Sequence, residues 1–239
     1  MSEIKNNLIK VRERIAQAAK RSGRTPESIQ LVAVSKTVPT EKMIEAIEAG
    51  ITDIGENRVQ EAVQKHQAIY ENEATSLLCK PVKWHLVGHL QRNKVKPALE
   101  IFDMIQSVDS VRLMDAIEKR AAQMDKVVDV LVEVNTSSEA TKYGIKPEEI
   151  VDFMERASQY DYLRVRGLMT IGLFADDPEV TRPCFQQLRA LRDKVAKLNL
   201  PRIEMKYLSM GMTNDFEVAI EEGANIVRIG TAIFGPRTQ

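Results

Sequence analysis

The chain has little cysteine, few aromatic residues and no net charge, and each of these limits what it can be. Its 239 residues include 34 Lys and Arg against 34 Asp and Glu, and aromatic residues make up 5%. Balanced charge with few aromatic side chains does not favour nucleic-acid binding. The two cysteines, Cys79 and Cys184, lie far apart and match no metal or redox spacing. We therefore expect no nucleic-acid partner, no metal site and the reduced setting of the cytoplasm.

Long apolar runs and common catalytic motifs are also absent from the sequence. The N-terminus, Met1-Ser-Glu-Ile-Lys-Asn, lacks the apolar core of a secretion signal, and no run reaches the length of a membrane span. There is no Gly-x-Ser-x-Gly elbow, no Walker loop and no Gly-x-Gly-x-x-Gly after a strand. These absences favour a cytoplasmic protein without membrane association.

Short apolar runs alternate with helical patterns along the chain. An amphipathic helix is expected from about Ile4 to Lys20, because one face carries Ile4, Leu8, Val11 and Ile15. Strands are expected at Leu31–Ser35, Asp53–Glu56, Trp84–Gly88, Met104–Ser107, Val130–Asn135, Val165–Ile171, Lys206–Ser209 and Asn225–Ile229. Helices are expected at Glu41–Ala49, Arg58–Tyr70, Val111–Gln123, Pro147–Gln159, Glu179–Leu198 and Asn214–Glu222, with a short one in Asn93–Glu100, where Pro97 limits its length.

This alternation predicts parallel strands joined by helical crossovers. Eight strands in a chain of this length suit an α/β fold of the (β/α)8 TIM-barrel type, which typically has ~250 residues. An open doubly wound sheet is the alternative. We favour the barrel, with an extra N-terminal helix, because the strand count reaches eight. No linker or composition shift marks a second domain, so residues 1–239 are expected to form one domain.

A lysine stands at the end of the first predicted strand. Val32, Val34 and Lys36 share one face of the run Gln30-Leu-Val-Ala-Val-Ser-Lys36. A strongly hydrated ammonium at the end of a buried strand is costly unless something there uses it. Such an amine can form a Schiff base with an aldehyde. The alternative is an ordinary lysine whose ammonium extends to solvent.

Two loops near the C-terminus have the composition of a phosphate site. After the seventh strand comes Ser209-Met-Gly-Met-Thr-Asn-Asp-Phe-Glu217, in which Asn214 and Glu217 predict a capping box at a helix start. A helix N-terminus behind small residues offers N–H groups to an anion. After the eighth strand, Gly230-Thr231 permits close backbone approach and adds a hydroxyl. Taken singly these are ordinary turn residues, but loops after barrel strands seven and eight commonly bind phosphate.

An arginine lies inside the apolar eighth strand. Arg228 shares strand parity with Ile226 and Gly230, so its side chain is expected in the barrel interior near the mouth. A buried guanidinium needs a partner, which is either an acid such as Glu56 or Glu133 or a ligand heteroatom. Together with an aldehyde-reactive amine and a phosphate site, this makes pyridoxal phosphate (PLP) a candidate ligand.

The histidines are weaker candidates. His85 and His89 fall in the predicted third strand and its following loop, with no carboxylate at ligand spacing. Lone histidines in such settings are mostly hydrogen-bonded structural groups.

Ordered motifs along nearly the whole chain carry a resemblance to a known family. They are Leu31-Val-Ala-Val-Ser-Lys-Thr37, Ile54-Gly-Glu-Asn-Arg-Val-Gln-Glu61, Trp84-His-Leu-Val-Gly-His-Leu-Gln-Arg-Asn-Lys94, Val165-Arg-Gly-Leu-Met169, Leu208-Ser-Met-Gly-Met-Thr-Asn-Asp215 and Val227-Arg-Ile-Gly-Thr-Ala-Ile-Phe-Gly235. Through them the chain resembles the pyridoxal-phosphate homeostasis proteins, which are similar to the barrel domain of alanine racemases. The resemblance implies a fold-type III arrangement, with PLP in the barrel mouth.

The resemblance also implies roles for single residues. Lys36 matches the Schiff-base lysine, and Arg228 matches an arginine beside the pyridine nitrogen or phosphate of the cofactor. The positions matching phosphate ligands are Ser209, Gly211, Gly230 and Thr231, and those matching residues that line the ring are Asn57 and Met169. Arg58 stands where many relatives carry an aromatic residue, which changes the expected ring-side wall.

The function implied by the resemblance is binding of PLP for vitamin B6 homeostasis, with effects on amino-acid and keto-acid balance and possible delivery to PLP-dependent apo-enzymes. An arginine at the pyridine nitrogen makes the ring a weaker electron sink than a carboxylate would. Racemases of this geometry add a tyrosine from a second domain, and the chain ends at Gln239, soon after its eighth strand. We therefore expect a monomer without efficient turnover. Alternatives are a slow PLP-dependent racemase or lyase, and an aldolase in which Lys36 acts on a sugar phosphate.

Overall fold

Eight parallel strands form a closed barrel in the computed structural model, which describes residues 2–70, 82–137, 139 and 141–236. The strands are β1 (Gln30–Val34), β2 (Asp53–Glu56), β3 (Lys83–Leu86), β4 (Met104–Val108), β5 (Val128–Glu133), β6 (Leu163–Met169), β7 (Ile203–Ser209) and β8 (Ile226–Ile229). Each strand pairs with its neighbours in sequence order, and β1 closes the barrel on β8. The predicted (β/α)8 barrel is therefore confirmed, and the open sheet is wrong.

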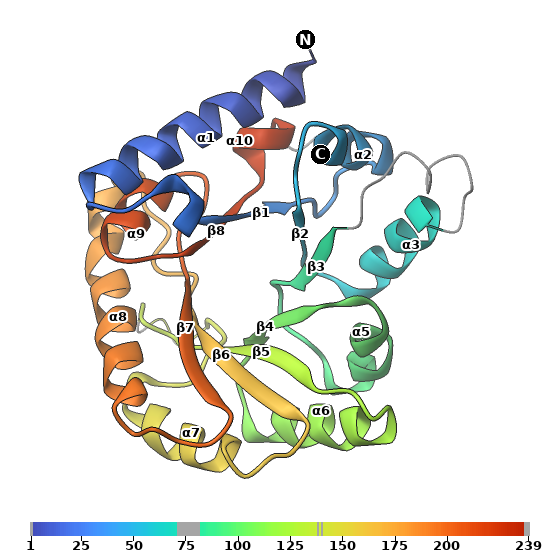
Figure 1. Ribbon diagram of the computed structural model, residues 1–239, viewed down its shortest axis with the longest axis vertical. Helices are drawn as coiled ribbons and strands as arrows, with labels where there is room; N and C mark the ends of the chain where they lie inside the picture. The colour runs from blue at the N-terminus through green and yellow to red at the C-terminus, as the bar shows by residue number, and fades with distance from the viewer. Residues whose placement is uncertain (1, 71–81, 138, 140, 237–239) are drawn as a thin grey trace.

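Helices surround the barrel, as Figure 1 shows. They are α1 (Glu3–Arg21), α2 (Thr40–Glu48), α3 (Val59–Tyr70), α5 (Val95–Ile101), α6 (Val111–Gln123), α7 (Ile150–Ala157), α8 (Arg182–Ala196), α9 (Phe216–Glu221) and α10 (Thr231–Phe234). Short 3-10 turns at Pro26–Ser28, Arg92–Lys94, Pro147–Glu149 and Pro178–Thr181 complete the described elements. No described helix is both long and apolar enough to cross a membrane.

The sequence predicted most element boundaries to within a few residues. Strand β2 and helix α6 have the predicted bounds, whereas β7 begins at Ile203 instead of Lys206 because Ile203 already pairs with Val165 of β6. The predicted helix at Glu179–Leu198 divides into a 3-10 turn and α8, which begins at Arg182. Pro183 stands in the first turn of α8, where a missing N–H costs nothing.

The additional helix α1 packs against the outside of the barrel near its closure. Its apolar stripe of Ile4, Leu8, Val11 and Ile15 is buried, as the periodicity predicts. In Figure 1, α1 runs beside α9 and α10, the helices that follow β7 and β8. Arg14 of α1 donates to Glu217 of α9 at 2.6 Å. Helix α1 thus supports the two loops in which the sequence predicts a phosphate site.

The strands separate two apolar layers. Alternate residues, such as Ala33 and Ile229, belong to the large core between strands and helices. The opposite parity fills the barrel interior with Val32, Val87, Met104, Leu131, Met169 and Ile226. Arg228 has the interior parity and is 4% exposed, so its predicted position inside the barrel is confirmed.

Candidate functional site

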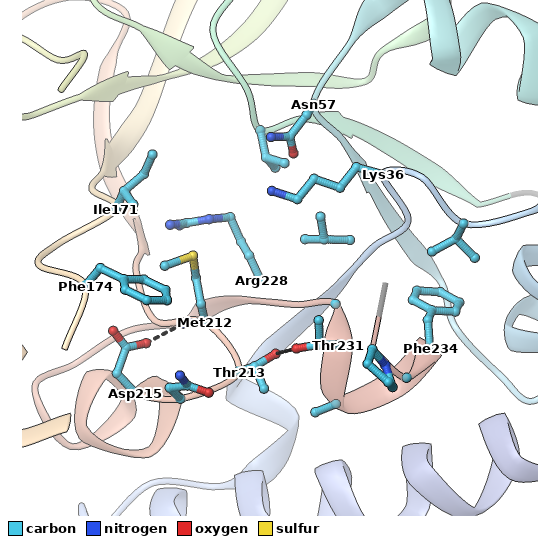
Figure 2. A pocket seen from close by; sticks show the side chains of 18 of the residues that line it. Lys36, Asn57, Ile171, Phe174, Met212, Thr213, Asp215, Arg228, Thr231 and Phe234 are labelled. Atoms are coloured by element: carbon cyan, nitrogen blue, oxygen red, sulfur yellow. Dashed lines mark hydrogen bonds between the residues drawn. The ribbon is translucent and has the colours of Figure 1, made fainter. Parts of the chain in front are cut away.

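A cavity of about 910 Å³ opens at the barrel mouth, the end where the strands have their carboxyl termini. This volume lies in the upper part of the range typical of small-molecule sites, ~300–1,000 Å³. Its polar lining is Lys36, Asn57, Thr213, Asn214, Asp215, Arg228 and Thr231, and its apolar lining includes Val34, Val38, Val87, Ile171, Leu173, Phe174, Met212 and Phe234. Figure 2 shows Lys36, Asn57 and Arg228 pointing into the same hollow. Residues distant in sequence therefore form one candidate binding site.

Lys36 is presented by a tight turn directly after β1. The N–H of Val38 donates to the carbonyl of Ser35 at 2.9 Å, so Lys36 and Thr37 are the two central residues of a four-residue turn. Thr37 has φ +62°, which is in the left-handed region. A β-branched residue rarely adopts this conformation, so contacts around the turn must maintain it.

The loop after β7 is held by Asp215. Its carboxylate accepts the Met212 N–H at 2.6 Å (Figure 2), and α9 begins at the next residue, Phe216. The predicted capping box of Asn214 and Glu217 is therefore wrong, because Asp215 is the N-cap residue and Glu217 pairs with Arg14 on α1. The Asp215 turn directs Met212 and Thr213 towards the cavity.

Two threonine hydroxyls meet where the loops after β7 and β8 come together. The Thr231 hydroxyl donates to that of Thr213 at 3.2 Å, and both residues line the cavity (Figure 2). Gly230, just before Thr231, lies so near β1 that a Cβ would be 3.1 Å from the Val34 carbonyl oxygen. The first N–H groups of α10, which begins at Thr231, have no acceptor within the helix. Hydroxyls and amides of this kind suit a phosphate.

Arg228 is fixed from two sides. Its Nη1 donates to the Ser209 hydroxyl at 2.7 Å, and its Nη2 donates to the Thr170 carbonyl at 2.8 Å. Burial lowers its pKa to about 10, against the attraction of Glu133 and Asp215. Neither acid proposed from the sequence hydrogen-bonds Arg228 in the described chain, and Glu56 contacts Lys65 instead. Arg228 therefore remains cationic at neutral pH, and Ser209 and Thr170 fix its guanidinium inside the barrel.

A hydrogen-bonded chain continues from Arg228 through the barrel interior. The Ser209 hydroxyl donates to Gln106 Oε1 at 2.6 Å, and Gln106 Nε2 lies 3.0 Å from His85 Nδ1. Because an amide nitrogen can only donate, His85 Nδ1 accepts and Nε2 carries the proton given to Asp53, 3.0 Å away. His85 is thus the hydrogen-bonded structural group predicted from the sequence, and the chain sets the orientation of the Arg228 side chain.

His89 also has a hydrogen-bonded place at the mouth. Its Nδ1 lies 2.9 Å from Asp109 Oδ2, and its ring stacks on Tyr143 with centroids 4.0 Å apart. Among the described residues, no group of three or more His, Cys, Asp or Glu could hold a metal ion. Cys184 is buried, and Cys79 lies outside the described residues.

Glu133, at the end of β5, is a buried acid near Arg228. Burial, reinforced by Asp109 and opposed by Arg228, raises its pKa to about 7. The folded protein therefore keeps a proton on Glu133 that the unfolded chain has already lost above pH ~4.5. The contribution of Glu133 to stability consequently falls as the pH rises from about 4.5 to 7, and it is constant above that range.

Replacing Glu133 by Gln is expected to remove this pH dependence. Through Glu133, the unchanged protein should lose about 2–3 kcal/mol of unfolding free energy between pH 5 and pH 8. The variant Glu133→Gln should not show this loss. Urea unfolding at both pH values measures the difference, and the exposed Glu41 of α2, changed to Gln, is the control. Equal pH dependence in Glu133→Gln and the unchanged protein would contradict the assignment.

Five of the eight residues predicted from the sequence line the cavity: Lys36, Asn57, Arg228, Gly230 and Thr231. The other three do not line it. Met169 fills the barrel interior, and the Ser209 hydroxyl is occupied by Arg228 and Gln106. Gly211 has φ +92° and packs so closely on α9 that a Cβ would be 2.5 Å from that of Ala219.

The sequence did not indicate that Thr213 lines the cavity, and it placed Arg58 at the ring-side wall, where the structure does not have it. Thr213, two residues after Gly211, lines the cavity and was not predicted, whereas the predicted Ser209 does not line it. Strand parity could have indicated this, because Ser209 shares parity with Tyr207, which packs in the barrel interior. Arg58 is exposed and does not line the cavity, so its side chain is not part of the ring-side wall.

Comparison with known proteins supports the fold and narrows the family. The family model described as the alanine racemase N-terminal domain matches residues 6–238 of the sequence. A pyridoxal phosphate homeostasis protein from Aquifex aeolicus is 43% identical over 230 residues, covering 96% of both chains. A solved structure from Bifidobacterium adolescentis, 38% identical, has a TM-score of 0.91 and covers 97% of this chain and 94% of its own.

A further relative has been solved with a ligand. PipY of Synechococcus elongatus, solved with PLP bound, is 34% identical with a TM-score of 0.78, covering 92% of this chain and 100% of its own. Sequence identity of 34–43% over nearly whole chains, together with the shared barrel fold, shows the family. The chain belongs to the pyridoxal phosphate homeostasis protein family, whose fold is that of the alanine racemase N-terminal domain.

Proposed function

We propose that the protein binds pyridoxal 5′-phosphate in the mouth cavity and holds it through a Schiff base to Lys36. The observation that carries this proposal is the arrangement of three groups in one cavity. The Lys36 amine, the paired hydroxyls of Thr213 and Thr231, and the Arg228 guanidinium reach it from different walls (Figure 2). PLP has a matching group for each: its aldehyde would react with the amine, its phosphate would bind the hydroxyls, and its ring nitrogen would lie beside the guanidinium.

The residues present fit the cofactor. Thr213, Thr231 and the backbone at Gly230 would hold the phosphate, at loops where barrel enzymes commonly bind one. Asn57 and apolar side chains such as Val87 and Met212 would line the ring. Ser209 and Gly211 would act indirectly, by fixing Arg228 and the loop after β7. Met169 would support the cavity floor from within the barrel.

The electrostatics favour retention of the cofactor over turnover. When bound, PLP supplies an electrophilic aldehyde and an electron-withdrawing ring. The ring withdraws electrons most strongly when a carboxylate keeps its nitrogen protonated, whereas a cationic arginine beside the nitrogen favours the unprotonated form. Arg228 stays charged at neutral pH, because its pKa is lowered only to about 10. We infer that Lys36 binds and releases PLP without efficient chemistry on amino acids.

The biological role that follows is homeostasis of PLP, the function in the name of the Aquifex aeolicus relative. We propose that the protein acts as a monomer that buffers PLP, releases it to apo-enzymes and so affects amino-acid and keto-acid balance. A slow racemase or lyase activity is the alternative.

Turnover and transfer assays distinguish these roles. The PLP-loaded protein is expected to convert no L-alanine to D-alanine and to transaminate no amino acid above the rate of free PLP. It is expected to activate an apo-transaminase added in the same buffer. Sustained racemisation or transamination by the purified protein would contradict the carrier role and support the enzyme.

A further inference from the structure

A charged cluster lies outside the barrel wall, directly behind the turn that presents Lys36. The cluster consists of Lys65 and Glu61 on α3 and Glu56 at the end of β2. Glu56 and Glu61 belong to the motif Gly-Glu-Asn-Arg-Val-Gln-Glu61, of which the proposed function uses only Asn57. Glu56 is fully buried and Lys65 is 6% exposed. Removing one partner of a buried ion pair is strongly destabilising, because the other group is left without its partner.

Lys65 has a complete set of partners. Its ammonium donates to the Ser35 carbonyl at 2.6 Å, to Glu56 Oε1 at 2.8 Å and to Glu61 Oε1 at 2.7 Å. An ammonium has three hydrogens, so these contacts use all of its donors. All three donor positions of Lys65 are therefore taken by acceptors of the protein.

The cluster holds the chain on both sides of Lys36. On one side, Ser35 gives its carbonyl to Lys65 and donates its hydroxyl to Glu56 Oε1 at 2.5 Å. On the other side, the Thr37 N–H donates to Glu61 Oε1 at 2.6 Å. Lys65 joins the two contacts, because the same ammonium binds Ser35 and Glu61.

The turn needs such support because of Thr37. Its φ of +62° at the third position of the turn is the conformation for which glycine is favoured. The Glu61 contact holds the Thr37 amide in that conformation, and the Lys65 contact holds the Ser35 carbonyl that closes the turn with Val38. Without these two contacts, Thr37 would relax to a more favourable φ. The Lys36 side chain would then no longer point into the cavity.

We propose that Lys65, with Glu61, is a positioning residue for covalent capture of PLP: it holds the Ser35–Val38 turn so that the Lys36 amine points into the cavity. This inference rests on the proposed function. Lys65 itself contacts neither the cavity nor the cofactor site, since it acts through the backbone of Ser35 and through Glu61.

The test compares cofactor-free proteins mixed with pyridoxal 5′-phosphate. In Lys65→Met, the rate of covalent attachment to Lys36, read from the borohydride-fixed peptide mass, is expected to fall at least about tenfold, as misplaced reacting groups do. The Thr37 amide should exchange its hydrogen faster in the cofactor-free variant. Lys126→Met is the matched control, because Lys126 also donates to a backbone carbonyl, that of Leu99 at 2.6 Å, outside the cavity lining. It should behave like the unchanged protein.

Rescue separates positioning from general damage. Glycine adopts a positive φ without strain, so adding Thr37→Gly to Lys65→Met should restore much of the attachment rate. If Lys65→Met does not fold, Glu61→Gln takes its place, with a smaller loss and the same faster exchange of the Thr37 amide. An unchanged attachment rate in the folded variant, or a loss that Thr37→Gly does not reduce, would overturn the proposal. No adduct on Lys36 in the unchanged protein would instead contradict the proposed function.

Discussion

Replacing Lys36 by alanine is expected to abolish covalent capture of PLP while leaving part of the binding. Lys36 supplies the amine, but Thr213, Gly230 and Thr231 form a separate wall made by the loops after β7 and β8. Charge-assisted hydrogen bonds to a phosphate are worth about 1.5–3 kcal/mol each and do not depend on the amine. The variant should therefore retain a dissociation constant on the order of 0.1 mM and give no borohydride-fixed adduct in the cavity.

Equilibrium dialysis and peptide mass mapping measure the two parts separately. Lys42→Ala is the control, because Lys42 is an exposed lysine of α2 and should leave both readouts unchanged. No affinity of Lys36→Ala for PLP would show that the phosphate wall is not an independent site. Transfer of the adduct to Lys65 would contradict the complete hydrogen bonding assigned to that ammonium.

Replacing Arg228 by leucine is expected to cause the largest loss of stability among these variants. Arg228 is the buried cation that offsets Glu133 and Asp215, and both carboxyls have their pKa raised by burial. Its removal also leaves the Thr170 carbonyl and the Ser209 hydroxyl without its hydrogen bonds. Loss of one partner of a buried charge pair typically costs about 3–5 kcal/mol, and the same is expected here.

The loss should depend on pH in a definite direction. Without Arg228 the pKa of Glu133 rises further, so the ionised carboxyls make the variant least stable near pH 8 and less affected near pH 5, where Glu133 is protonated. Urea unfolding at both pH values measures this. Arg192→Leu, which removes the exposed pair with Asp193, should cost no more than about 1 kcal/mol. A similar cost for both variants at pH 8 would contradict the role of Arg228.

The fold and the two central site residues were predictable from the sequence because each leaves a periodic signal. Strand–helix alternation gave the barrel. Lys36 and Arg228 were conspicuous because a charge on an apolar strand is costly, and parity gave their side of the strand. The family motifs added the assignment of the loops after the seventh and eighth strands to the same site as Lys36 and Arg228.

What the sequence did not predict depends on contacts between distant segments. Thr213 lies in a loop with no periodicity, and only the folded chain shows its hydroxyl beside that of Thr231. The spacing of Glu61 and Lys65 on one helix predicts an ordinary surface ion pair. The burial of Lys65 against Ser35, on which the proposed support of the Lys36 turn rests, arises from the packing of α3 on β2 and on the residue that follows β1.

The most direct test of Schiff-base binding at Lys36 is the absorbance of the purified protein mixed with pyridoxal 5′-phosphate, before and after borohydride, followed by peptide mass mapping. A Schiff base on Lys36 predicts a yellow band that borohydride bleaches, with a phosphopyridoxyl group left on Lys36. A colourless mixture with an unmodified Lys36 peptide would contradict it and favour an aldolase that uses Lys36 on a sugar phosphate directly.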